Sequence, residues 1–363
     1  MKVQVLLPKI FNFTFTYNLD HKKKYKKGDV VEIPFGSKKE IGVIWNNTNS
    51  IPKNIKIKNI TKKIENFSIN QKLIDFIEWF SMYNMVPRGL ALKMCIGNGR
   101  NLFKKKDQIK KSKKIKVTKY SLNKEQEDSL KYLENIRGKF NVSVLQGATG
   151  SGKTLVYFER IKKIIEENKQ ALVLLPEIFL TNQFRSRFEE FFGFPPAVWH
   201  SRITPKNKRI ILKGIIQNKI KLIIGARSSL MLPFKKLGII IVDEEHDVSY
   251  KQDEGVIYNA RDMAIARANF ERIPINLVTA VPSLETYANI KNNKYSSSRL
   301  INRYKEASLP TYEIIDLKKN KLSKQSWISS ETVKKVKKHL NLENQILFFI
   351  NRRGFAPYVL CKK

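Results

Sequence analysis

The segment Gly147-Ala148-Thr149-Gly150-Ser151-Gly152-Lys153-Thr154 follows the apolar run Val142–Leu145 and precedes a helical pattern, Leu155–Lys169. It fits the phosphate-loop pattern G-x-x-x-x-G-K-[ST], with an additional glycine at position 150. Glycines let backbone N–H groups surround phosphates, and the helix N-terminus adds its positive dipole end. Lys153 is expected to neutralise the β- and γ-phosphates, and the Thr154 hydroxyl to bind Mg²⁺. The alternative, a chance glycine-rich turn, is disfavoured because the flanking strand and helix are both of the required type.

A second motif follows another apolar run, Gly238–Val242, and reads Asp243-Glu244-Glu245-His246-Asp247. In open α/β sheets, ligands bind beyond the carboxyl ends of the strands, where this run delivers Asp243. Asp243 suits water-mediated Mg²⁺ binding, Glu244 is placed to orient and deprotonate an attacking water, and His246 could couple nucleotide state to a neighbouring element. An acidic strand end alone is often a solvated turn. Together with the phosphate loop it predicts a site for nucleoside triphosphate hydrolysis.

The rest of the chain after Ser121 alternates apolar β-branched runs with helical stretches. Runs that are apolar on both faces and separated by crossover-length segments are typical of a parallel sheet covered by helices. The predicted strands are Val142–Leu145, Ala171–Leu175, Lys221–Ile224, Gly238–Val242, Ile275–Val278 and Ile346–Ile350. The fold class is therefore α/β, with a parallel-sheet phosphate-loop domain.

The N-terminal part has a different texture. Short β-rich segments at Val3–Leu7, Val30–Ile33 and Ile41–Trp45 are separated by turn signals, and a helix is predicted over Asn70–Tyr83. Residues 104–119 hold nine lysines and one acid, so this stretch is predicted to be a solvated linker. Leu309-Pro310 reads as a further boundary, followed by a predicted strand at Tyr312–Ile315. These patterns divide the chain into a β-rich domain over 1–103, a linker over 104–120, an α/β lobe over 121–309 and a further segment over 310–363.

Composition narrows the class of partners. The 363 residues carry 69 Lys and Arg against 32 Asp and Glu, a formal net charge of +37, which attracts polyanions. Nucleic acid is favoured over a membrane surface because no basic amphipathic helix stands out, and no apolar run is long enough to span a bilayer. Two cysteines exclude a disulfide framework, so a soluble intracellular protein is expected.

The order of motifs resembles that of superfamily 2 DEAH-type helicases, and specifically the PriA family of replication-restart helicases. The resemblance covers nearly the whole chain. It is carried by Leu122–Gln126, the phosphate loop, Pro176–Thr181, Trp199–Ser201, Gly225–Phe234, Asp243–Asp247, Ser249–Gln252, Asn259–Asp262, Pro282–Glu285 and Asn351–Pro357. It implies a RecA-like helicase lobe behind a small β-rich domain that binds DNA 3′-ends.

The resemblance implies an ATP- and Mg²⁺-dependent DNA helicase of the primosome that unwinds 3′→5′ at stalled or abandoned forks and restarts replication. In it, Gln126 would read adenine, beside the phosphate-loop residues 147–154 and Asp243. His246, Arg227, Tyr250 and Tyr258 would couple DNA contact to hydrolysis, with aromatics of the 250–258 loop stacking on single-stranded bases.

The resemblance also implies a 3′-end pocket. Phe15, Gly36 and Lys58 would hold the terminal nucleotide, with Thr16 where relatives carry an acidic residue. From sequence alone, Phe15 reads more simply as a core residue on a strand face. Forked and single-stranded DNA are the implied nucleic-acid partners. Single-stranded-DNA-binding protein and primosome loading proteins are the implied protein partners, with a cytoplasmic, nucleoid-associated location and no membrane.

Three further departures from the family pattern stand out. Val281 replaces a threonine in the motif Thr279–Pro282, and a buried valine there would be sterically mild but chemically silent. The spacing before Leu122 leaves no room for a winged-helix domain. Cys361 matches the first of eight zinc-binding cysteines, and the chain stops at Lys363, so Zn²⁺ is expected only in a complete protein. Cys95 is expected to be a small buried hydrophobe.

The expectation for this chain alone is ATP and DNA binding with little or no unwinding, as a fragment or a truncated product. The alternatives are another superfamily 2 DNA translocase and a non-catalytic fork-DNA-binding fragment.

Overall fold

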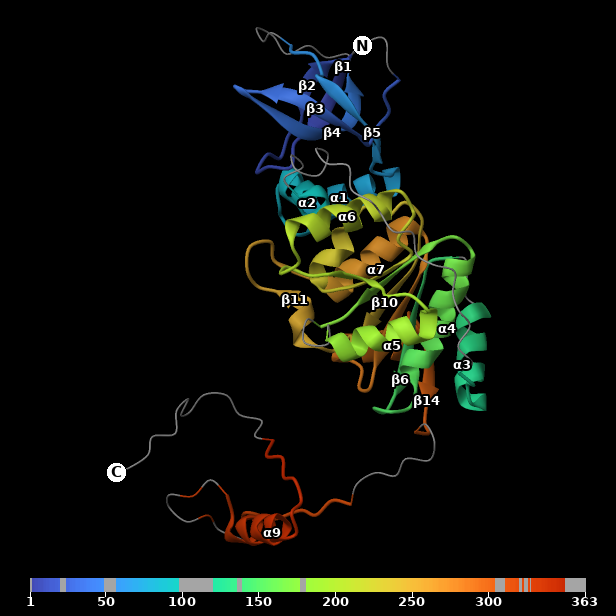
Figure 1. The fold of residues 1–363 in the computed structure, drawn as a ribbon, viewed down its shortest axis with the longest axis vertical. Helices are drawn as coiled ribbons and strands as arrows, with labels where there is room; N and C mark the ends of the chain where they lie inside the picture. Colours follow the sequence, from blue (N-terminus) through green and yellow to red (C-terminus); the bar gives the residue numbers. More distant parts are fainter. Residues whose placement is uncertain are drawn as a thin grey trace, which may run out of the picture. The chain divides into compact units, whose positions relative to one another are not determined.

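The computed structural model describes residues 2–19, 24–48, 57–97, 120–135, 139–176, 181–303, 311–319, 322, 326 and 328–349. The chain forms two compact units, Met1–Ala307 and Ser308–Lys363. The described residues of the first unit form a five-stranded, a seven-stranded and a two-stranded sheet. Helices surround the two larger sheets (Figure 1). The predicted linker at 104–119, the boundary at Leu309-Pro310 and the motif at 351–357 lie outside the described residues, as does most of the motif at Pro176–Thr181.

The first sheet is antiparallel and is built from the N-terminal strands. Within the described residues its order is β2 (Phe15–Asn18), β1 (Lys2–Leu6), β4 (Lys38–Thr48), β3 (Asp29–Phe35) and β5 (Lys62–Ser68). Neighbouring residues of β3 and β4 are buried in succession, because successive side chains point to opposite faces and both faces pack: Val43 lies in one hydrophobic cluster and Ile44 in another. The three strands predicted in this region are confirmed as β1, β3 and β4.

The pairing of β5 with β3 is interrupted. Asp29 pairs with Ser68 and Val31 with Lys63, so two steps along β3 are matched by five along β5. Three additional residues therefore bulge out of β5 between Lys63 and Ser68. Asn66, in this bulge, has a φ of +58°. Bulges of this kind redirect side chains away from the sheet.

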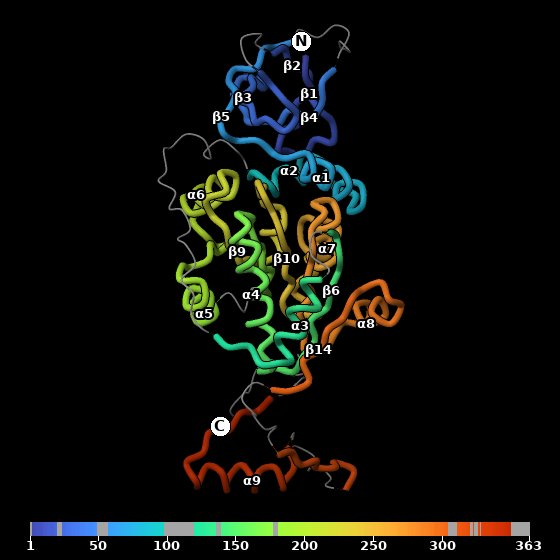
Figure 2. Tube along the Cα trace, turned by 90° about the vertical axis from the view of Figure 1, so that its right-hand side faces the viewer, coloured from blue at the N-terminus to red at the C-terminus, as the bar shows by residue number. Residues whose placement is uncertain are grey.

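Two helices follow the first sheet, α1 (Gln71–Tyr83) and α2 (Arg88–Ile96). The helix predicted at Asn70–Tyr83 is confirmed, with Asn70 as its N-cap: the Asn70 side chain accepts a hydrogen bond from Leu73 N at 2.7 Å. The face of α1 that carries Phe76 and Phe80 packs toward α7 (Ala260–Glu271). In Figure 2 both helices lie between the first sheet and the second.

The second sheet is parallel throughout its described strands. Its order is β14 (Ser296–Leu300), β6 (Asn141–Gly147), β13 (Pro274–Thr279), β10 (Leu237–Asp243), β7 (Gln170–Leu174), β9 (Leu222–Gly225) and β8 (Ala197–Trp199). Five of the six strands predicted after Ser121 are confirmed as β6, β7, β9, β10 and β13. Strands β8 and β14 were not predicted, because one is three residues long and the other is mostly serine.

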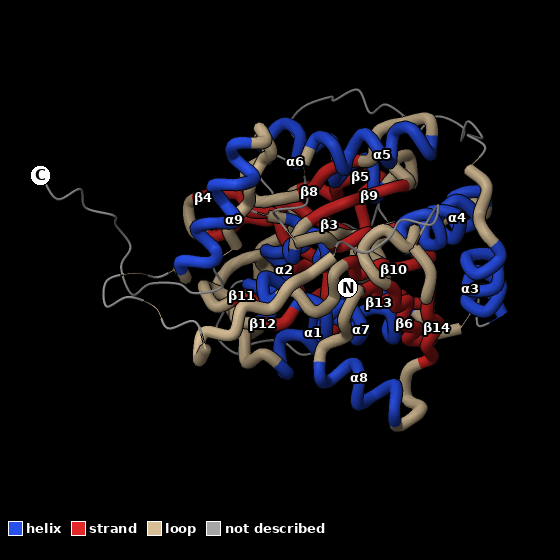
Figure 3. The backbone as a smooth tube through the Cα atoms, turned by 90° about the horizontal axis from the view of Figure 1, so that it is seen from below, coloured by secondary structure: helices blue, strands red, loops and turns tan. Residues whose placement is uncertain are grey.

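The second sheet is covered on both faces. On β10, Ile240 and Val242 pack with one hydrophobic cluster and Ile239 and Ile241 with the other. The first cluster receives α6 (Pro205–Ile216), α7 and the α1 and α2 pair, and the second receives α3 (Lys124–Asn135), α4 (Lys153–Glu166) and α5 (Asn182–Phe192). Figure 3 shows these strands with helices on either side. This confirms the α/β class and the preceding β-rich part.

Short elements complete the first unit, all after β9. They are η2 (Arg227–Met231), η3 (Val248–Tyr250), β11 (Lys251–Gln252), β12 (Tyr258–Asn259) and α8 (Leu284–Lys291).

The described part of the second unit contains α9 (Ser330–Asn341), none of whose residues is buried. The predicted strand at Tyr312–Ile315 is wrong, and residues 346–349 of the other strand predicted here are not in a strand. Tyr312, Ile314 and Leu347 are more than 80% exposed. A strand needs a neighbouring strand and a surface to pack against, and the described residues of this unit offer neither.

Candidate functional site

The phosphate-loop segment joins the end of β6 to the start of α4. Gly150 and Gly152 both have a φ of +84°, which residues with a side chain rarely adopt. A Cβ on Gly147 would lie 2.5 Å from Ser151 Oγ, and one on Gly152 would lie 2.2 Å from Gln126 Nε2. Ala148 and Thr149 are exposed at the tip of the loop. Conformation therefore requires glycine at 150, space requires it at 147, and both require it at 152.

Lys153 points back into this loop. Its Nζ donates hydrogen bonds to Gly147 O at 2.6 Å and Ala148 O at 3.2 Å. Burial lowers the pKa of Lys153, while the carboxylates of Glu244 and Asp243 raise it. The Ser151 Oγ is buried and has no hydrogen-bond partner among the described residues. The loop thus surrounds an ammonium group with carbonyl oxygens where a phosphate could take their place.

Asp243 ends β10 opposite the loop. Its Oδ2 accepts from the Tyr157 hydroxyl at 2.9 Å and its Oδ1 from Glu244 N at 3.1 Å. Burial raises the pKa of Asp243 to about 6, and the nearby charge of Glu244 adds to the shift. No ion pair joins Asp243 to a described lysine or arginine. Glu244 itself has a φ of +50° and is partly exposed.

The two motifs line one cavity of about 540 Å³. From the predicted set it is lined by Thr149, Gly150, Gly152, Lys153, Thr154, Asp243 and Glu244. Sequence reasoning missed the wall formed by α5 and the chain before α3, which contributes Tyr120, Phe184, Arg187, Glu190 and Phe191. The Tyr120 and Phe191 rings stack at 5.6 Å. No motif marks these residues, because only the fold brings α5 beside the loop.

Gln126 does not line this cavity. It is fully buried, and its Nε2 donates to Ser151 O at 3.0 Å while its Oε1 accepts from Asn123 N at 3.0 Å. Asn123 Oδ1 in turn accepts from Gln126 N at 2.9 Å, which makes a reciprocal cap at the start of α3. In this structure the amide of Gln126 ties α3 to the phosphate loop.

A polar network joins the end of β10 to the start of α8. Glu245, which sequence reasoning left without a role, accepts from Ser283 N at 2.8 Å and from Thr286 Oγ1 at 2.9 Å, and pairs with Arg261 at 3.3 Å. This buried carboxylate is thereby fully bonded. The sequence does not distinguish Glu245, which is bonded to other residues of the protein, from Glu244, which is open to the cavity, because both are glutamates in adjacent positions.

His246 contacts the motif that follows β13. Its Nδ1 lies 2.8 Å from Thr279 Oγ1, which donates to Val281 O at 2.7 Å. Because the hydroxyl proton goes to Val281 O, the hydroxyl accepts from His246 Nδ1. The expectation of a buried valine is wrong: Val281 is 69% exposed, since it lies in the turn beyond the end of β13.

Three of the residues predicted to couple DNA contact to hydrolysis lie at the base of the 250–258 loop. The buried Tyr250 hydroxyl donates to Asp243 O at 2.5 Å and to Leu174 O at 3.0 Å, and Arg227 donates to Lys251 O at 2.6 Å. Tyr258 is buried against Phe80 of α1, with ring centroids 5.5 Å apart. Neither tyrosine offers a ring face to a base here, so the expectation of stacking platforms is not met. Both rings instead anchor the loop.

The predicted 3′-end residues lie on the first sheet. Phe15 on β2 contacts Phe11, Phe13 and Phe35, each at 5.1 Å between ring centroids. Gly36, with a φ of +59°, follows Phe35 in an open turn where a Cβ would meet nothing within 4 Å. Thr16 pairs with Gln4, and the exposed Lys58 accepts from Asn18 N through its carbonyl. Phe13, which sequence reasoning missed, is 55% exposed and gives this aromatic cluster an open face.

The described residues hold no cluster of His, Cys, Asp and Glu that could bind a metal ion. Cys95 is buried as expected, and burial raises the pKa of its thiol to about 12. Cys361 lies outside the described residues. Among the described helices, none is long and apolar enough to cross a membrane.

Two known protein families match separate segments of the chain, and individual relatives match nearly all of it. The 3′DNA-binding domain family of PriA matches residues 2–97, and the DEAD/DEAH box helicase family matches residues 123–290. The replication restart protein PriA of Rickettsia felis is 40% identical over 367 residues, which cover 99% of this chain and 55% of that protein. That of Haemophilus influenzae is 41% identical over 222 residues, 61% of this chain and 30% of that protein.

The chain therefore spans about half the length of the curated relatives it matches. Among solved structures, RecG bound to a three-way DNA junction gives a TM-score of 0.39 at 21% identity, covering 64% of this chain and 30% of that one.

Proposed function

Because this chain belongs to the PriA family of replication restart proteins, we propose that it is the ATP-binding and DNA-end-binding part of a 3′→5′ DNA helicase that restarts replication at stalled forks. The observation that carries this proposal is the single cavity of about 540 Å³ shared by the phosphate loop and the Asp243–Glu244 pair. Two motifs 90 residues apart in sequence meet there, in the arrangement that triphosphate hydrolysis requires.

The donor set fits ATP with Mg²⁺. When ATP binds, Lys153 Nζ would donate to the β- and γ-phosphates instead of to the carbonyls of Gly147 and Ala148. Backbone N–H groups of the loop would surround the phosphates. Thr154 and Asp243 would hold Mg²⁺, because a buried carboxylate with no cationic side chain within ion-pair distance favours a cation. Mg²⁺ supplies neutralisation of the phosphate charge. Glu244, open to the cavity, would orient and deprotonate the attacking water.

We assign the coupling of DNA contact to ATP hydrolysis to hydrogen bonds that join residues at the cavity to neighbouring elements. Tyr250 bonds the carbonyl of Asp243, and His246 reaches Thr279. A movement of the 250–258 loop would thus reach the Mg²⁺-binding carboxylate, and a movement of the chain after Asp243 would reach the start of α8 through Glu245. Arg227 and Tyr258 would hold the two sides of that loop.

The DNA contacts are assigned to the first sheet and the motor lobe. Phe15, Gly36 and Lys58, with Thr16 beside them, would take a 3′-terminal nucleotide: an aromatic can stack on a base and a lysine can meet phosphate. Single-stranded DNA of the fork would run over the lobe. The proposed domains are a β-rich DNA-binding domain over 1–103, a linker over 104–120, an ATP-binding lobe over 121–309 and a further segment over 310–363.

The protein partners and the metal are assigned by family. Single-stranded-DNA-binding protein and primosome loading proteins are the proposed partners, in the cytoplasm at the nucleoid. Cys361 would bind Zn²⁺ only together with cysteines of a longer chain.

The first test is steady-state ATP hydrolysis by this chain, with and without forked DNA that ends in a 3′-OH. Turnover that DNA stimulates and that Lys153→Ala abolishes would support the motor. Lys162→Ala is the matched control, because Lys162 lies on the same helix and pairs with Glu159 at 3.2 Å outside the cavity.

The other outcomes separate the alternatives. Tight, salt-sensitive fork binding with no turnover would identify a DNA-binding part whose motor needs a second lobe. Fork binding that does not distinguish a 3′-OH from a 3′-phosphate, or that is unchanged by Phe15→Ala, would remove the 3′-end assignment. Failure to bind ATP analogues at all would overturn the proposal.

A further inference from the structure

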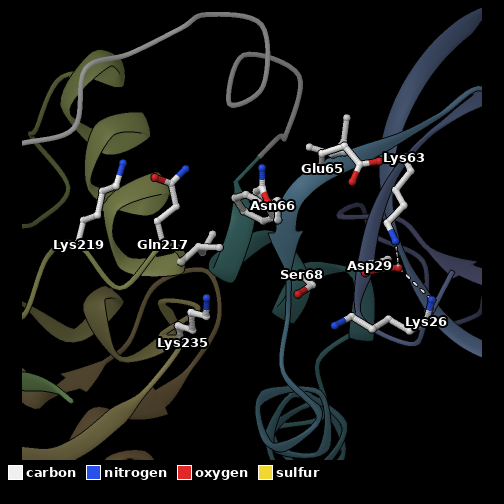
Figure 4. Close-up of a pocket in the computed structure, with 12 residues that line it drawn as sticks. Lys26, Asp29, Lys63, Glu65, Asn66, Ser68, Gln217, Lys219 and Lys235 are labelled. Atoms are coloured by element: carbon white, nitrogen blue, oxygen red, sulfur yellow. Dashed lines mark hydrogen bonds and ion pairs between the residues drawn. The ribbon is translucent and has the colours of Figure 1, made fainter. Parts of the chain in front are cut away.

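A second large cavity, of about 690 Å³, lies within the first unit, away from the phosphate loop. One wall comes from the first sheet, at β5 and the start of β3, and the other from the end of α6 and the turn before β10. Figure 4 shows these two walls facing each other. Its lining includes the β5 residues from Lys63 to Ser68, together with Lys26, Lys219 and Lys235.

The bulge in β5 forms the middle of this groove. The three additional residues between Lys63 and Ser68 carry the chain out of the sheet, and Ile64 to Phe67 line the cavity as a result. A regular strand would keep these side chains alternating on the sheet faces. The bulge therefore makes the wall of the groove and interrupts the ladder between β3 and β5 at this point.

The charges in the groove are positive and uncompensated. Asp29 is buried and satisfied, since its Oδ2 lies 2.7 Å from Lys63 Nζ and accepts from Lys26 N at 2.9 Å. That pair cancels. Lys26, Lys219 and Lys235 form no ion pair with any described residue, and Glu65 is the one remaining acid in the lining. Three lysines from two walls thus line one space, and with Glu65 they give it a net charge of about +2.

We propose that this groove binds the phosphodiester backbone of DNA, as a site separate from the 3′-end pocket and the motor. Lysines act as compact point charges for phosphates, and the Asn66 and Gln217 amides and the Ser68 hydroxyl supply the neutral donors that usually accompany them. Phe15 lies on β2, at the other end of the strand order from β5, so the two sites do not share residues. The inference rests on the proposed function only in that the ligand is the same fork.

The two walls also explain what the groove would do. One wall belongs to the segment matched by the 3′DNA-binding domain and the other to the segment matched by the helicase. A strand held by both would be kept in register between the captured end and the motor. Contacts to phosphate position DNA without reading its sequence.

The test compares two triple variants of the full chain in binding to a fluorescent fork with a 3′-OH, titrated with salt. The groove variant is Lys26→Gln/Lys219→Gln/Lys235→Gln. The control, with the same change in charge at exposed positions elsewhere, is Lys93→Gln/Lys131→Gln/Lys291→Gln. Each lost phosphate contact lowers the slope of log K against log salt by about 0.7 for single strands, so the groove variant should lose about 2 in slope.

Affinity of the groove variant at low salt should fall tenfold or more, and that of the control should change less than threefold. The preference for 3′-OH over 3′-phosphate should survive in both. As a second readout, fork DNA should protect Lys219 and Lys235, but not Lys93, from chemical acetylation.

Equal slopes and affinities for the two variants, or unprotected groove lysines, would overturn the groove while the proposed function stands. Absence of fork binding by the unmodified chain would overturn both. A matching thermal unfolding midpoint for the two variants excludes misfolding as the cause of a difference.

Discussion

At the scale of single residues, the phosphate loop depends on glycines for two separate reasons, conformation and space. Gly152 and Gly255 both have left-handed backbones, with φ of +84° and +70°. A Cβ on Gly152 would collide with Gln126 Nε2, whereas one on Gly255 would meet nothing within 4 Å. Substitution of Gly255 therefore tests the effect of conformation alone, and substitution of Gly152 tests conformation and space together.

We expect Gly255→Ala to cost about 1–2 kcal/mol of stability, the strain of a left-handed alanine, and to leave nucleotide binding intact. Gly152→Ala should cost more and should abolish binding of a fluorescent ATP analogue, because Gln126 must leave Ser151. Chemical denaturation and fluorescence titration measure the two quantities. Normal nucleotide affinity in Gly152→Ala would show that Gln126 does not hold the loop.

At the scale of secondary-structure elements, the N-termini of helices differ in what their caps contact. Asn70 caps α1 and also donates from Nδ2 to Phe234 O at 3.1 Å, which ties α1 to the chain before β10. Thr204 caps α6 through Asn207 N alone. Each cap should contribute about 1 kcal/mol, and the second bond of Asn70 about 1 more.

Asn70→Ala should therefore lower the free energy of unfolding by about 2 kcal/mol, and Thr204→Ala by about 1. Equal losses in urea denaturation would mean that the bond from Asn70 to Phe234 contributes nothing.

The contact between α7 and its neighbours contains a buried charge. Arg267 is fully buried, pairs with Glu271 at 3.5 Å, donates to Leu230 O, and lies 5.8 Å from the Phe76 ring of α1. Arg267→Met should destabilise by about 3–5 kcal/mol, because Glu271 would remain buried without its partner.

The double variant Arg267→Met/Glu271→Leu should recover most of that stability, since apolar residues often replace a buried pair without loss. Thermal unfolding of the single and double variants measures the difference. A double variant as unstable as the single one would assign the loss to Leu230 and the aromatic rings instead.

At the scale of the whole molecule, one hydrophobic cluster crosses between the two sheets. It includes Leu6 and Val43 of the first sheet, Phe76 of α1, and Leu172 and Ile240 of the second. Scanning calorimetry of the full chain should therefore show one main transition for the first unit, because parts that share a core unfold together. Two well-separated transitions would contradict this.

The sequence predicts most of the second sheet and the two motifs at its edge because the signals there are local. A phosphate loop needs its own glycines, and a parallel strand buried on both faces needs a run of apolar residues, so β6, β10 and the two motifs could be found by reading along the chain. Lys153 and Asp243 meet in one cavity because the phosphate loop follows the end of β6 and Asp243 ends β10, at the same edge of the sheet.

What could not be predicted depends on partners distant in sequence. A tyrosine looks the same in the sequence whether its ring stacks on a base or packs in a core. The ring of Tyr258 packs against Phe80, a residue distant in sequence, and this contact cannot be read along the chain. The serines of β14 show no β pattern, since β6 alone supplies the pairing. The β5 bulge, likewise, appears only once the register with β3 is known.

The crossing of one core between two sheets also has a consequence for descent. A recombination event that exchanged the N-terminal segment alone would set a foreign α1 against α7, with Phe76 and Phe80 unmatched to their pockets. Hybrids of that kind should be less stable than either parent, because the shared core would be poorly packed. We therefore expect the sequences of the two segments, 2–97 and 123–290, to drift together rather than independently.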